Sequence, residues 1–203
     1  LVRINAPRSA IDLAIVPHLG RLASEYPGIT LEVVADEGFA NIVEQGFDAG
    51  IRLGEDLHND MRAVRLTPDL RFAIVATPDY FQRHGEPTHP QDLLQHRCIG
   101  WRKASSGERY KWAFQQGEQR FSVAVNSPLI VDDARLLLQA ALAHVGIAFA
   151  IEQEVEGHLA SGRLRRVLAD WCAPFPGFYL YYPNRRNHSV ALATVIELLR
   201  LPT

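Results

Sequence analysis

The order of strand-like and helix-like segments constrains the fold of this chain more than any other feature. Residues 1–6 have the pattern of a strand, and apolar residues then recur at near-helical spacing over residues 11–23. A second strand pattern at residues 29–35, a short helical pattern at 38–47 and a third strand at 48–53 follow. The order β-α-β-α-β predicts an α/β fold with a parallel sheet and right-handed crossovers. The second strand becomes continuously apolar, which is typical of a strand that is covered on both faces.

A second block of elements follows residue 61. Strand patterns at residues 62–66 and 71–76 flank a turn, and the segment 78–98 is rich in turn residues before it becomes helical. Residues 111–125, "KWAFQQGEQRFSVAV", predict a hairpin in which the aromatic residues of the first arm face apolar residues of the second. This block therefore repeats the alternation of strands and helices with different details.

The rest of this block continues the same alternation. Asp133 is predicted to cap a helix that ends at Gly146, and residues 147–151 form a buried strand pattern. A helical segment at 152–162 and a strand at 163–168 follow.

One strand and one helix arrive only after the second block is complete, at residues 177–183 and 188–201. The first block has too few elements to cover its own sheet, so we expect this terminal pair to return to it. The prediction is two Rossmann-like subdomains joined by two crossover strands. Subdomain I comprises residues 1–75 plus 178–203, and subdomain II comprises residues 76–177. A two-lobed α/β molecule of this kind places a ligand cleft between its lobes.

The composition excludes several classes of protein. A formal net charge of −2 provides no basic surface for nucleic acid. The longest apolar region is interrupted by Gln139, His144 and Gly146, which makes it too short to span a bilayer, so we expect a soluble, cytoplasmic chain without membrane contact. Cys98 and Cys172 are expected to be reduced, buried residues. Because residue 1 already lies in a strand pattern, we expect the chain to be a domain of a longer protein.

No catalytic or metal-binding motif stands out. The histidines occur without an HxH or HExxH spacing, and the sequence has no GxSxG motif, no Walker loop and no GxGxxG after the first strand. We therefore expect no catalytic residues, no metal, no cofactor and no enzymatic activity. The eight histidines are His18, His58, His84, His89, His96, His144, His158 and His188.

Several motifs occur together along the whole chain. They are "YPGITLEVV", "EQGFDAGIRLGE", "ATPDYFQRHGEPTHPQDLLQHRCI", "LLLQAALAHVGIAF" and "PGFYLYYPNRR". In this order they resemble the effector-binding domain of LysR-type transcriptional regulators. The resemblance implies a periplasmic-binding-protein-like fold of type 2. It also implies a homodimer or homotetramer, and DNA contact only through an N-terminal winged helix-turn-helix that this sequence lacks. The two cysteines lack the close spacing of the peroxide-sensing branch of the family, so no thiol switch is expected.

A candidate ligand site lies where the first strand ends and the next helix begins. Pro7, Arg8, Ser9 and Ala10 occupy this junction, with Ser9 as the expected N-cap of the helix. The unpaired amides of a first helical turn and the positive end of its dipole favour an anion or a polar atom. In the family, this position lines the effector pocket. The alternatives are a plain N-cap for Ser9 and a solvated side chain for Arg8.

Two further candidates lie in the first block. Alternation along the third strand places Arg52 at the carboxyl edge of the parallel sheet, where such folds bind ligands. An ion pair with Glu55 is an equally favoured alternative for Arg52. Phe39 is either a wall of the cleft or an ordinary core residue, and the core is the simpler interpretation.

The second block contributes the remaining candidates. Trp101 and Ser105 belong to the segment "WRKASSGERY", a polar loop that could cover the cleft. Asp133 caps the helix that we expect to face the cleft, and its carboxylate argues against a second acidic group there. Phe149 completes the set. We therefore expect a small effector with a polar or carboxylated group on the first lobe and an aromatic or apolar body against Trp101 and Phe149.

The functional hypothesis is a ligand-sensing domain that binds a small molecule and passes the result to a DNA-binding domain. The alternative is a periplasmic solute-binding protein of a transport system, which shares the fold. The basic clusters at 163–166 and 184–186 are expected to be solvated faces. Contact with RNA polymerase or with a neighbouring subunit is a weaker alternative for them.

Overall fold

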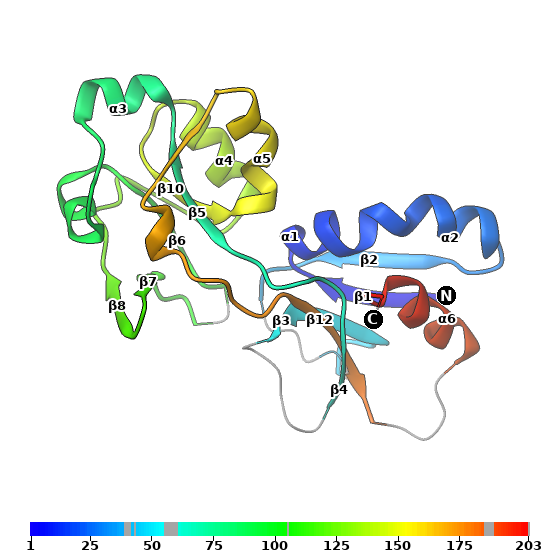
Figure 1. Cartoon of the computed structure of the whole chain (residues 1–203). Helices are drawn as coiled ribbons and strands as arrows, with labels where there is room; N and C mark the ends of the chain where they lie inside the picture. The colour runs from blue at the N-terminus through cyan, green and yellow to red at the C-terminus, as the bar shows by residue number, and fades with distance from the viewer. Residues whose placement is uncertain (39–41, 43, 55–60, 105, 185–188, 203) are drawn as a thin grey trace. The chain divides into compact units, whose positions relative to one another are not determined.

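A computed structural model describes residues 1–38, 42, 44–54, 61–104, 106–184 and 189–202. The chain divides into two compact units, each with its own core (Figure 1). Unit 1 comprises Leu1–Leu70 and Pro176–Thr203, and unit 2 comprises Arg71–Phe175. The chain therefore leaves unit 1 once, builds unit 2 from one continuous segment, and returns.

Unit 1 is built on a five-stranded mixed sheet with the order β2-β1-β3-β12-β4. Strand β1 pairs in parallel with both β2 and β3, which the β-α-β-α-β order predicted. Strand β12 comes from the end of the chain and lies antiparallel between β3 and β4, so the terminal strand does return to the first sheet. The strands are β1 (Val2–Ala6), β2 (Leu31–Ala35), β3 (Ala49–Leu53), β4 (Met61–Arg65) and β12 (Phe178–Pro183).

Strand β2 differs from its prediction. Its apolar run was expected to be covered on both faces, but β2 is the edge strand of the sheet, and its residues are half-buried or exposed. The expectation was wrong because burial depends on what packs around a strand. An edge strand has a single neighbour in the sheet, so an apolar composition does not by itself place it in the centre.

The helical segment after β1 is continuous but irregular. It consists of α1 (Arg8–Ala10), a π-helical turn η1 (Ile11–Ile15), a 3-10 turn η2 (Val16–His18) and α2 (Leu19–Glu25). The irregular turns adjoin Pro17, which has no N–H to donate and whose ring crowds the carbonyl four residues earlier. The apolar spacing therefore predicted the helical segment correctly, although a regular α-helix does not pass through the proline.

The start of this segment corrects the predicted cap. Pro7 is the N-cap, with the extended angles φ −65° and ψ 153°, and the helix begins at Arg8. Ser9, expected at the N-cap, lies inside the first turn instead. Proline fixes φ near the value found here and needs no amide partner, so the chain turns into the helix directly after it.

Helix α6 (Val190–Leu199) completes unit 1. Ser189 caps it by accepting a hydrogen bond from the amide of Leu192 at 3.1 Å. Its buried face includes Val195 and Ile196, and the helix contacts β1 (Figure 1). The last helix of the sequence thus covers the first strand, because the first strands alone leave their apolar face open.

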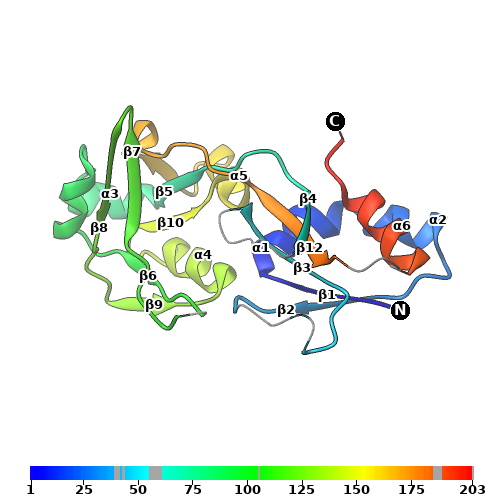
Figure 2. The ribbon, with the colours of Figure 1, turned by 90° about the horizontal axis from the view of Figure 1, so that it is seen from below.

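Unit 2 contains three small sheets. Strand β5 lies between β10 and β11 and is antiparallel to both. Strand β6 pairs in parallel with β9, and β7 and β8 form a hairpin (Figure 2). In the hairpin, Phe114 lies opposite Phe121, as the sequence predicted. The strands are β5 (Phe72–Ala76), β6 (Ile99–Trp101), β7 (Trp112–Gln116), β8 (Gln119–Val123), β9 (Leu129–Val131), β10 (Ala148–Ile151) and β11 (Arg165–Val167).

The helices of unit 2 differ from the predictions in two places. Helix α3 begins directly after Thr77, whose hydroxyl accepts from the amide of Tyr80, so the segment expected to start with turns starts with a helix. Helix α4 ends at Leu142 rather than at Gly146. The helical elements are α3 (Pro78–His84), η4 (Pro90–Gln95), α4 (Ala134–Leu142), α5 (Glu152–Ala160) and η5 (Ala169–Trp171).

Gly146 does not end a helix; it allows another backbone segment to pack closely against it. The chain leaves α4 through His144, which has a left-handed φ of 60°. At Gly146 the carbonyl oxygen of Arg97 lies 2.4 Å from where a Cβ would be placed. Glycine is therefore required there because another backbone segment approaches closely.

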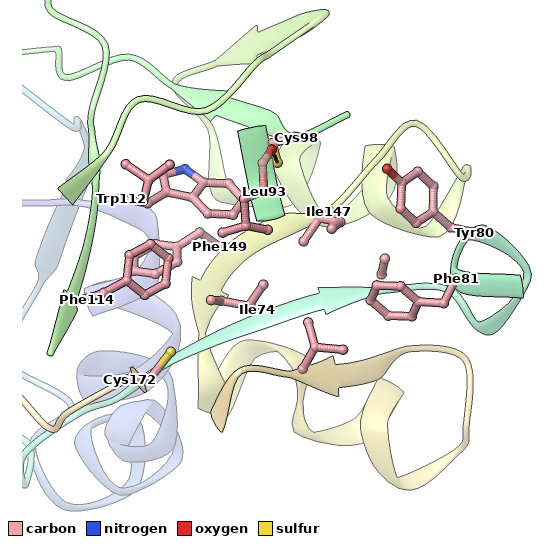
Figure 3. Packing of buried hydrophobic residues seen from close by; sticks show 13 residues of the cluster. Ile74, Tyr80, Phe81, Leu93, Cys98, Trp112, Phe114, Ile147, Phe149 and Cys172 are labelled. Atoms are coloured by element: carbon pink, nitrogen blue, oxygen red, sulfur yellow. Dashed lines mark hydrogen bonds between the residues drawn. The ribbon is translucent and has the colours of Figure 1, made fainter. Parts of the chain in front are cut away.

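The core of unit 2 on one face of β5 is dominated by aromatic rings (Figure 3). The ring of Phe149 stacks on Phe72 at a centroid distance of 4.3 Å and on Trp112 at 5.2 Å. On the opposite face of the strand, Ala73 and Val75 belong to an aliphatic cluster that α4 and α5 cover. Strand β5 is thus buried on both faces.

Among the described residues, no helix has the length and apolar character needed to cross a bilayer.

The two cysteines are free and buried, as predicted. Burial raises the pKa of the Cys98 thiol to about 12 and that of Cys172 to about 11.

We expect both thiols to resist iodoacetamide at pH 8 in the folded protein and to react within the same time once urea unfolds it, because the thiolate is the reactive form. Mass spectrometry of the alkylated protein measures this, and rapid labelling of the native chain would contradict it.

A second prediction concerns the close approach at Gly177. A Cβ there would lie 2.1 Å from the carbonyl oxygen of Pro68 and 2.2 Å from the hydroxyl of Thr67. Gly177→Ala is expected to lower the free energy of unfolding by about 1–3 kcal/mol or more, because the backbone must move to admit the methyl group.

Two helical glycines with open surroundings are matched controls. Nothing lies within 4 Å of a Cβ at Gly20 in α2 or at Gly157 in α5. Alanine at either position should raise the free energy of unfolding by up to about 1 kcal/mol. Urea denaturation followed by circular dichroism compares the three variants, and an equal effect at Gly177 and Gly20 would contradict the packing argument.

A third prediction concerns His96, which is 9% exposed. Its Nδ1 lies 3.3 Å from the hydroxyl of Tyr80, which in turn accepts from the amide of Arg97 at 3.0 Å. Burial lowers the pKa of His96 below 6.5, and the charge of His84 lowers it further, while Asp92 opposes the shift. The folded state therefore favours the neutral ring.

The sign of the pH effect follows from this shift. As pH falls through about 6.5, the unfolded state takes up a proton at His96 more readily than the folded state, so this histidine lowers stability progressively below neutral pH. We expect His96→Gln to reduce the loss of stability between pH 7.5 and 5.5. Tyr80→Phe, which removes the neighbouring hydroxyl but no histidine, should lower stability at every pH and leave the slope nearly unchanged. Urea denaturation at a series of pH values measures both, and an unaltered slope in His96→Gln would contradict the prediction.

Candidate functional site

The candidate site in unit 1 lies at the carboxyl ends of three parallel strands. Strands β1, β2 and β3 end at Ala6, Ala35 and Leu53, so the segments that follow them emerge at the same edge of the sheet. In open α/β sheets, ligands bind beyond this edge, where loops and helix starts converge. The polar residues of this region are therefore the candidate ligand-binding residues.

The junction predicted as a ligand site is largely buried. Pro7, Ser9 and Ala10 are buried, and Arg8 is half-buried. The backbone amide of Arg8 donates a hydrogen bond of 3.0 Å to the carboxylate of Glu37, which follows β2. An internal carboxylate thus already occupies the first amide of the helical segment. A ligand carboxylate at this amide would have to displace Glu37.

Arg52 lies at the carboxyl end of β3, where it is buried in a polar network. The residue is 4% exposed. Its guanidinium donates to the carbonyl of Ile51 at 2.6 Å, to the side-chain oxygen of Asn5 at 2.5 Å and to the carbonyl of Gly38. These acceptors come from β3, from β1 and from the segment after β2. Arg52 thus connects three pieces of chain that are far apart in the sequence. Its predicted alternative partner Glu55 lies outside the described residues.

The network continues into the segment after β2. The amide of Asn5 lies 3.4 Å from one oxygen of Asp36, and the other oxygen accepts from the amide of Gly38 at 2.8 Å. Asp36 therefore holds the turn that presents the Gly38 carbonyl to Arg52 and carries Glu37 to the helix start. The geometry of the Arg8 junction and the burial of Arg52 depend on the same short turn.

Tyr181 of β12 borders this network. In the sheet, Gly50 pairs with both Asn5 and Tyr181, and the ring of Tyr181 covers Gly50 so closely that a Cβ would lie 2.4 Å from the ring. Burial raises the pKa of Tyr181, and the positive charge of Arg52 partly opposes this shift. Glycine at position 50 is thus what allows a large aromatic ring to lie over the sheet next to the guanidinium.

Sequence reasoning missed Asn5 and Tyr181. A signal for Asn5 was present, because a polar amide in the middle of an otherwise apolar strand must find a partner when the strand is buried. Tyr181 gave no such signal, since aromatic residues are common in strands. Its position opposite Gly50 depends on a pairing between segments more than a hundred residues apart.

The predicted ligand residues of unit 2 are spread over separate elements. Asp133 caps α4 as predicted, because its carboxylate accepts from the amide of Leu136 at 2.8 Å. Trp101, at the end of β6, is half-buried against the aliphatic cluster, whereas Phe149 is 8% exposed within the aromatic cluster on the other face of β5. The structure does not bring these two rings into one cluster. Ser105 and Phe39 lie outside the described residues.

A hydroxyl, an imidazole and a carboxylate meet beside α3. The hydroxyl of Thr77 lies 2.7 Å from Nδ1 of His144, and a carboxylate oxygen of Asp79 lies 3.5 Å from the same nitrogen. A proton relay needs the hydroxyl and the carboxylate on different ring nitrogens. Thr77 also serves as the helix cap, so this group is structural. Within the described part of the chain, no three His, Cys, Asp or Glu side chains gather in a way that could hold a metal ion.

The basic residues near the end of unit 2 are held by acidic partners. Arg165 forms an ion pair of 2.8 Å with Glu86, and Arg166 forms one with Glu152. These contacts agree with the interpretation of this cluster as a face balanced by acidic residues. The second basic cluster, at 184–186, lies mostly outside the described residues.

Comparison with known proteins gives a family for the chain. The family model described as "LysR substrate binding domain" matches residues 1–201. A putative transcriptional regulator of Pseudomonas aeruginosa is 45% identical over 199 residues, and the HTH-type transcriptional regulator YcaN of Escherichia coli is 37% identical over 199 residues. Each alignment covers 98% of this chain and 65% of the relative. The chain thus spans about two thirds of the length of these relatives.

Solved structures agree on the fold. The regulatory domain of CrgA, a LysR-type transcriptional regulator from Neisseria meningitidis, superposes with a TM-score of 0.83 at 24% identity, covering 98% of this chain and 96% of that domain. Full-length AphB, a virulence activator of Vibrio cholerae, gives a TM-score of 0.83 at 20% identity and covers 98% of this chain and 66% of that protein. The predicted periplasmic-binding-protein-like α/β fold is confirmed.

These relatives are transcriptional regulators, and none of those named above is a solute-binding protein of a transport system, so the alternative function is not favoured. The family model covers nearly every residue, and the first relative shares close to half of its aligned sequence with this chain. The chain therefore belongs to the LysR substrate-binding domain family.

Proposed function

We propose that this chain is the ligand-sensing part of a LysR-type transcriptional regulator. It binds a small-molecule effector at the polar edge of the unit 1 sheet and controls DNA binding by a part of the protein outside this chain. The family match and the names of the relatives support this proposal. The relatives are longer than this chain, which leaves room for a DNA-binding region. The regulator acts as a homo-oligomer in the cytoplasm, where its DNA is located.

The observation that carries the proposed site is the contact between the Arg8 amide and Glu37. A backbone amide at the start of a helical segment attracts anions, and here it holds a carboxylate from the same chain. The half-buried Arg8 side chain adds a cationic group beside this neutral donor. The junction thus offers a hydrogen-bond donor and a cation to a carboxylate. In our proposal, the carboxylate of a ligand replaces that of Glu37.

Displacement of Glu37 provides a means of signalling. Glu37 belongs to the turn that Asp36 and Gly38 form, and the carbonyl of Gly38 is an acceptor for Arg52. An effector that takes the Arg8 amide releases Glu37 and changes the restraints on this turn. An effector shifts the equilibrium only if it binds two states with different affinities, and a coupling of about 1–3 kcal/mol is enough for regulation.

The proposal predicts how variants at the junction change carboxylate binding. Benzoate and hexanoate serve as probes with one carboxylate and an aromatic or aliphatic body. Glu37→Gln removes the internal competitor, so we expect it to bind the better probe about tenfold more tightly than the wild type. Ser9→Ala and Arg8→Gln should weaken the same probe by about fivefold or more. Isothermal titration calorimetry on the purified chain measures these affinities.

A matched control separates a local effect from a change in net charge. Glu25 is the last residue of α2 and pairs with Arg21. Glu25→Gln therefore removes the same charge at the opposite end of the helical segment from the junction. It should leave the affinity unchanged. Equal affinities for the wild type, Glu37→Gln and Ser9→Ala would place carboxylate binding elsewhere. Absence of binding even in Glu37→Gln would remove this junction as a carboxylate site.

A further inference from the structure

The described residues between β6 and β7 form two paired arms that are rich in basic residues. We define the basic hairpin as residues 102–103 and 107–111, which contain Arg102, Lys103, Arg109 and Lys111 together with a single acidic residue, Glu108. All five charged side chains belong to exposed residues. The hairpin therefore presents four positive charges and one negative charge to solvent.

Backbone contacts fix the base of the basic hairpin. The amide of Arg102 donates to the carbonyl of Val131 in β9 at 2.8 Å, and the amide of Tyr110 donates to the carbonyl of Trp101 at 2.8 Å. The amide of Lys103 donates to the backbone carbonyl of Glu108 at 2.9 Å, which continues the pairing of the two arms. The parallel pair of β6 and β9 supports this base (Figure 2). The cations are thus displayed on an ordered frame.

Two like charges face one another across this frame. Arg102 and Arg109 form an antiparallel bridge, so their Cβ atoms are direct neighbours. Like charges directly opposite one another destabilise a strand pair. The side chain of Arg102 turns to the carbonyl of Gly107 at 2.6 Å, and Lys103 lies over the ring of Tyr110 at 5.4 Å. Neither contact neutralises a positive charge.

Several arginines elsewhere in the chain do have acidic partners. Arg3, Arg21, Arg65 and Arg83 each form an ion pair with a carboxylate, as do the arginines of the cluster in β11. None of the four cations of the basic hairpin forms an ion pair with the described part of the chain. The basic hairpin is thus a place where positive charge is concentrated and left without an internal counter-charge.

From this arrangement we propose that the basic hairpin binds a small oxyanion with two or more negative charges. An oxyanion between Arg102 and Arg109 converts a repulsive pair into two charge-assisted hydrogen bonds, and guanidinium groups match the geometry of phosphate and carboxylate oxygens. The footprint is small, because Glu108 lies within the hairpin and Asp132 directly follows the Val131 that anchors it. The negative charges of Glu108 and Asp132 repel a long polyanion. The basic hairpin belongs to unit 2, whereas the junction at Arg8 belongs to unit 1.

The test uses pyrophosphate and citrate as probes at low ionic strength, with acetate at matched ionic strength as the monovalent control. We expect one or both polyvalent anions to bind and acetate not to bind at the same concentration. Arg109→Gln should weaken the tighter probe at least about tenfold, and Glu108→Gln should strengthen it. The tighter probe shows whether phosphate or carboxylate groups are preferred. Isothermal titration calorimetry gives the dissociation constants.

Arg120 on β8 provides the matched control, because it is an exposed arginine of the same unit outside the basic hairpin. Arg120→Gln should bind pyrophosphate like the wild type. Pyrophosphate carries no carboxylate, which keeps this result distinct from the carboxylate titrations at the junction of unit 1. The melting temperature distinguishes loss of the anion site from a general loss of stability. Without anion, Arg109→Gln should melt at a higher temperature than the wild type in low salt, because the repulsion is gone, and it should lose the anion-dependent rise in Tm.

Two results would overturn the proposal. The first is that neither pyrophosphate nor citrate binds the wild-type chain more tightly than acetate at low ionic strength. The second is that Arg109→Gln and Arg120→Gln weaken binding equally, which would show a response to overall charge rather than a site.

Discussion

The buried guanidinium of Arg52 is the interaction on which the organisation of unit 1 depends. A charge in the protein interior is costly unless hydrogen bonds satisfy it, so the acceptors around Arg52 must stay in place. They come from β1, from β3 and from the turn after β2. That turn also carries Glu37 to the Arg8 amide. One buried cation thus fixes the ends of three segments and, through them, the junction that we propose as the effector site.

The sequence was sufficient to predict the parts of the fold that follow from local patterns. Alternating strands and helices required a parallel sheet, and β12 returned to that sheet because the first block could not cover its own apolar faces. The edge position of β2 could not be predicted, because it depends on neighbours distant in the sequence. The cap at Pro7 was missed for a local reason, since serine is the commoner cap and the restriction that proline places on φ was given too little weight.

The candidate site was predictable in position but not in detail. The carboxyl edge of a parallel sheet directed attention to Arg8, Ser9 and Arg52. Arg52 donates to neutral oxygens of three segments, and one of them, Asn5, lies 47 residues away from it in the chain. In unit 2, Phe149 was expected beside an effector, yet an aromatic ring on a fully buried strand packs with other aromatic rings when the sheet offers them. Hydrophobicity alone does not separate a pocket wall from a core.

The two proposed sites differ in how an anion would gain free energy on binding. At the junction in unit 1, the favourable contacts already exist within the chain, so a ligand gains only the difference between its own contacts and those of Glu37. Such a site binds weakly unless the rest of the ligand contributes, and it is therefore selective for the whole molecule. At the basic hairpin, no internal carboxylate among the described residues must be displaced, and an anion relieves the repulsion between Arg102 and Arg109. Binding there depends on charge and falls with salt, because both arginines are exposed.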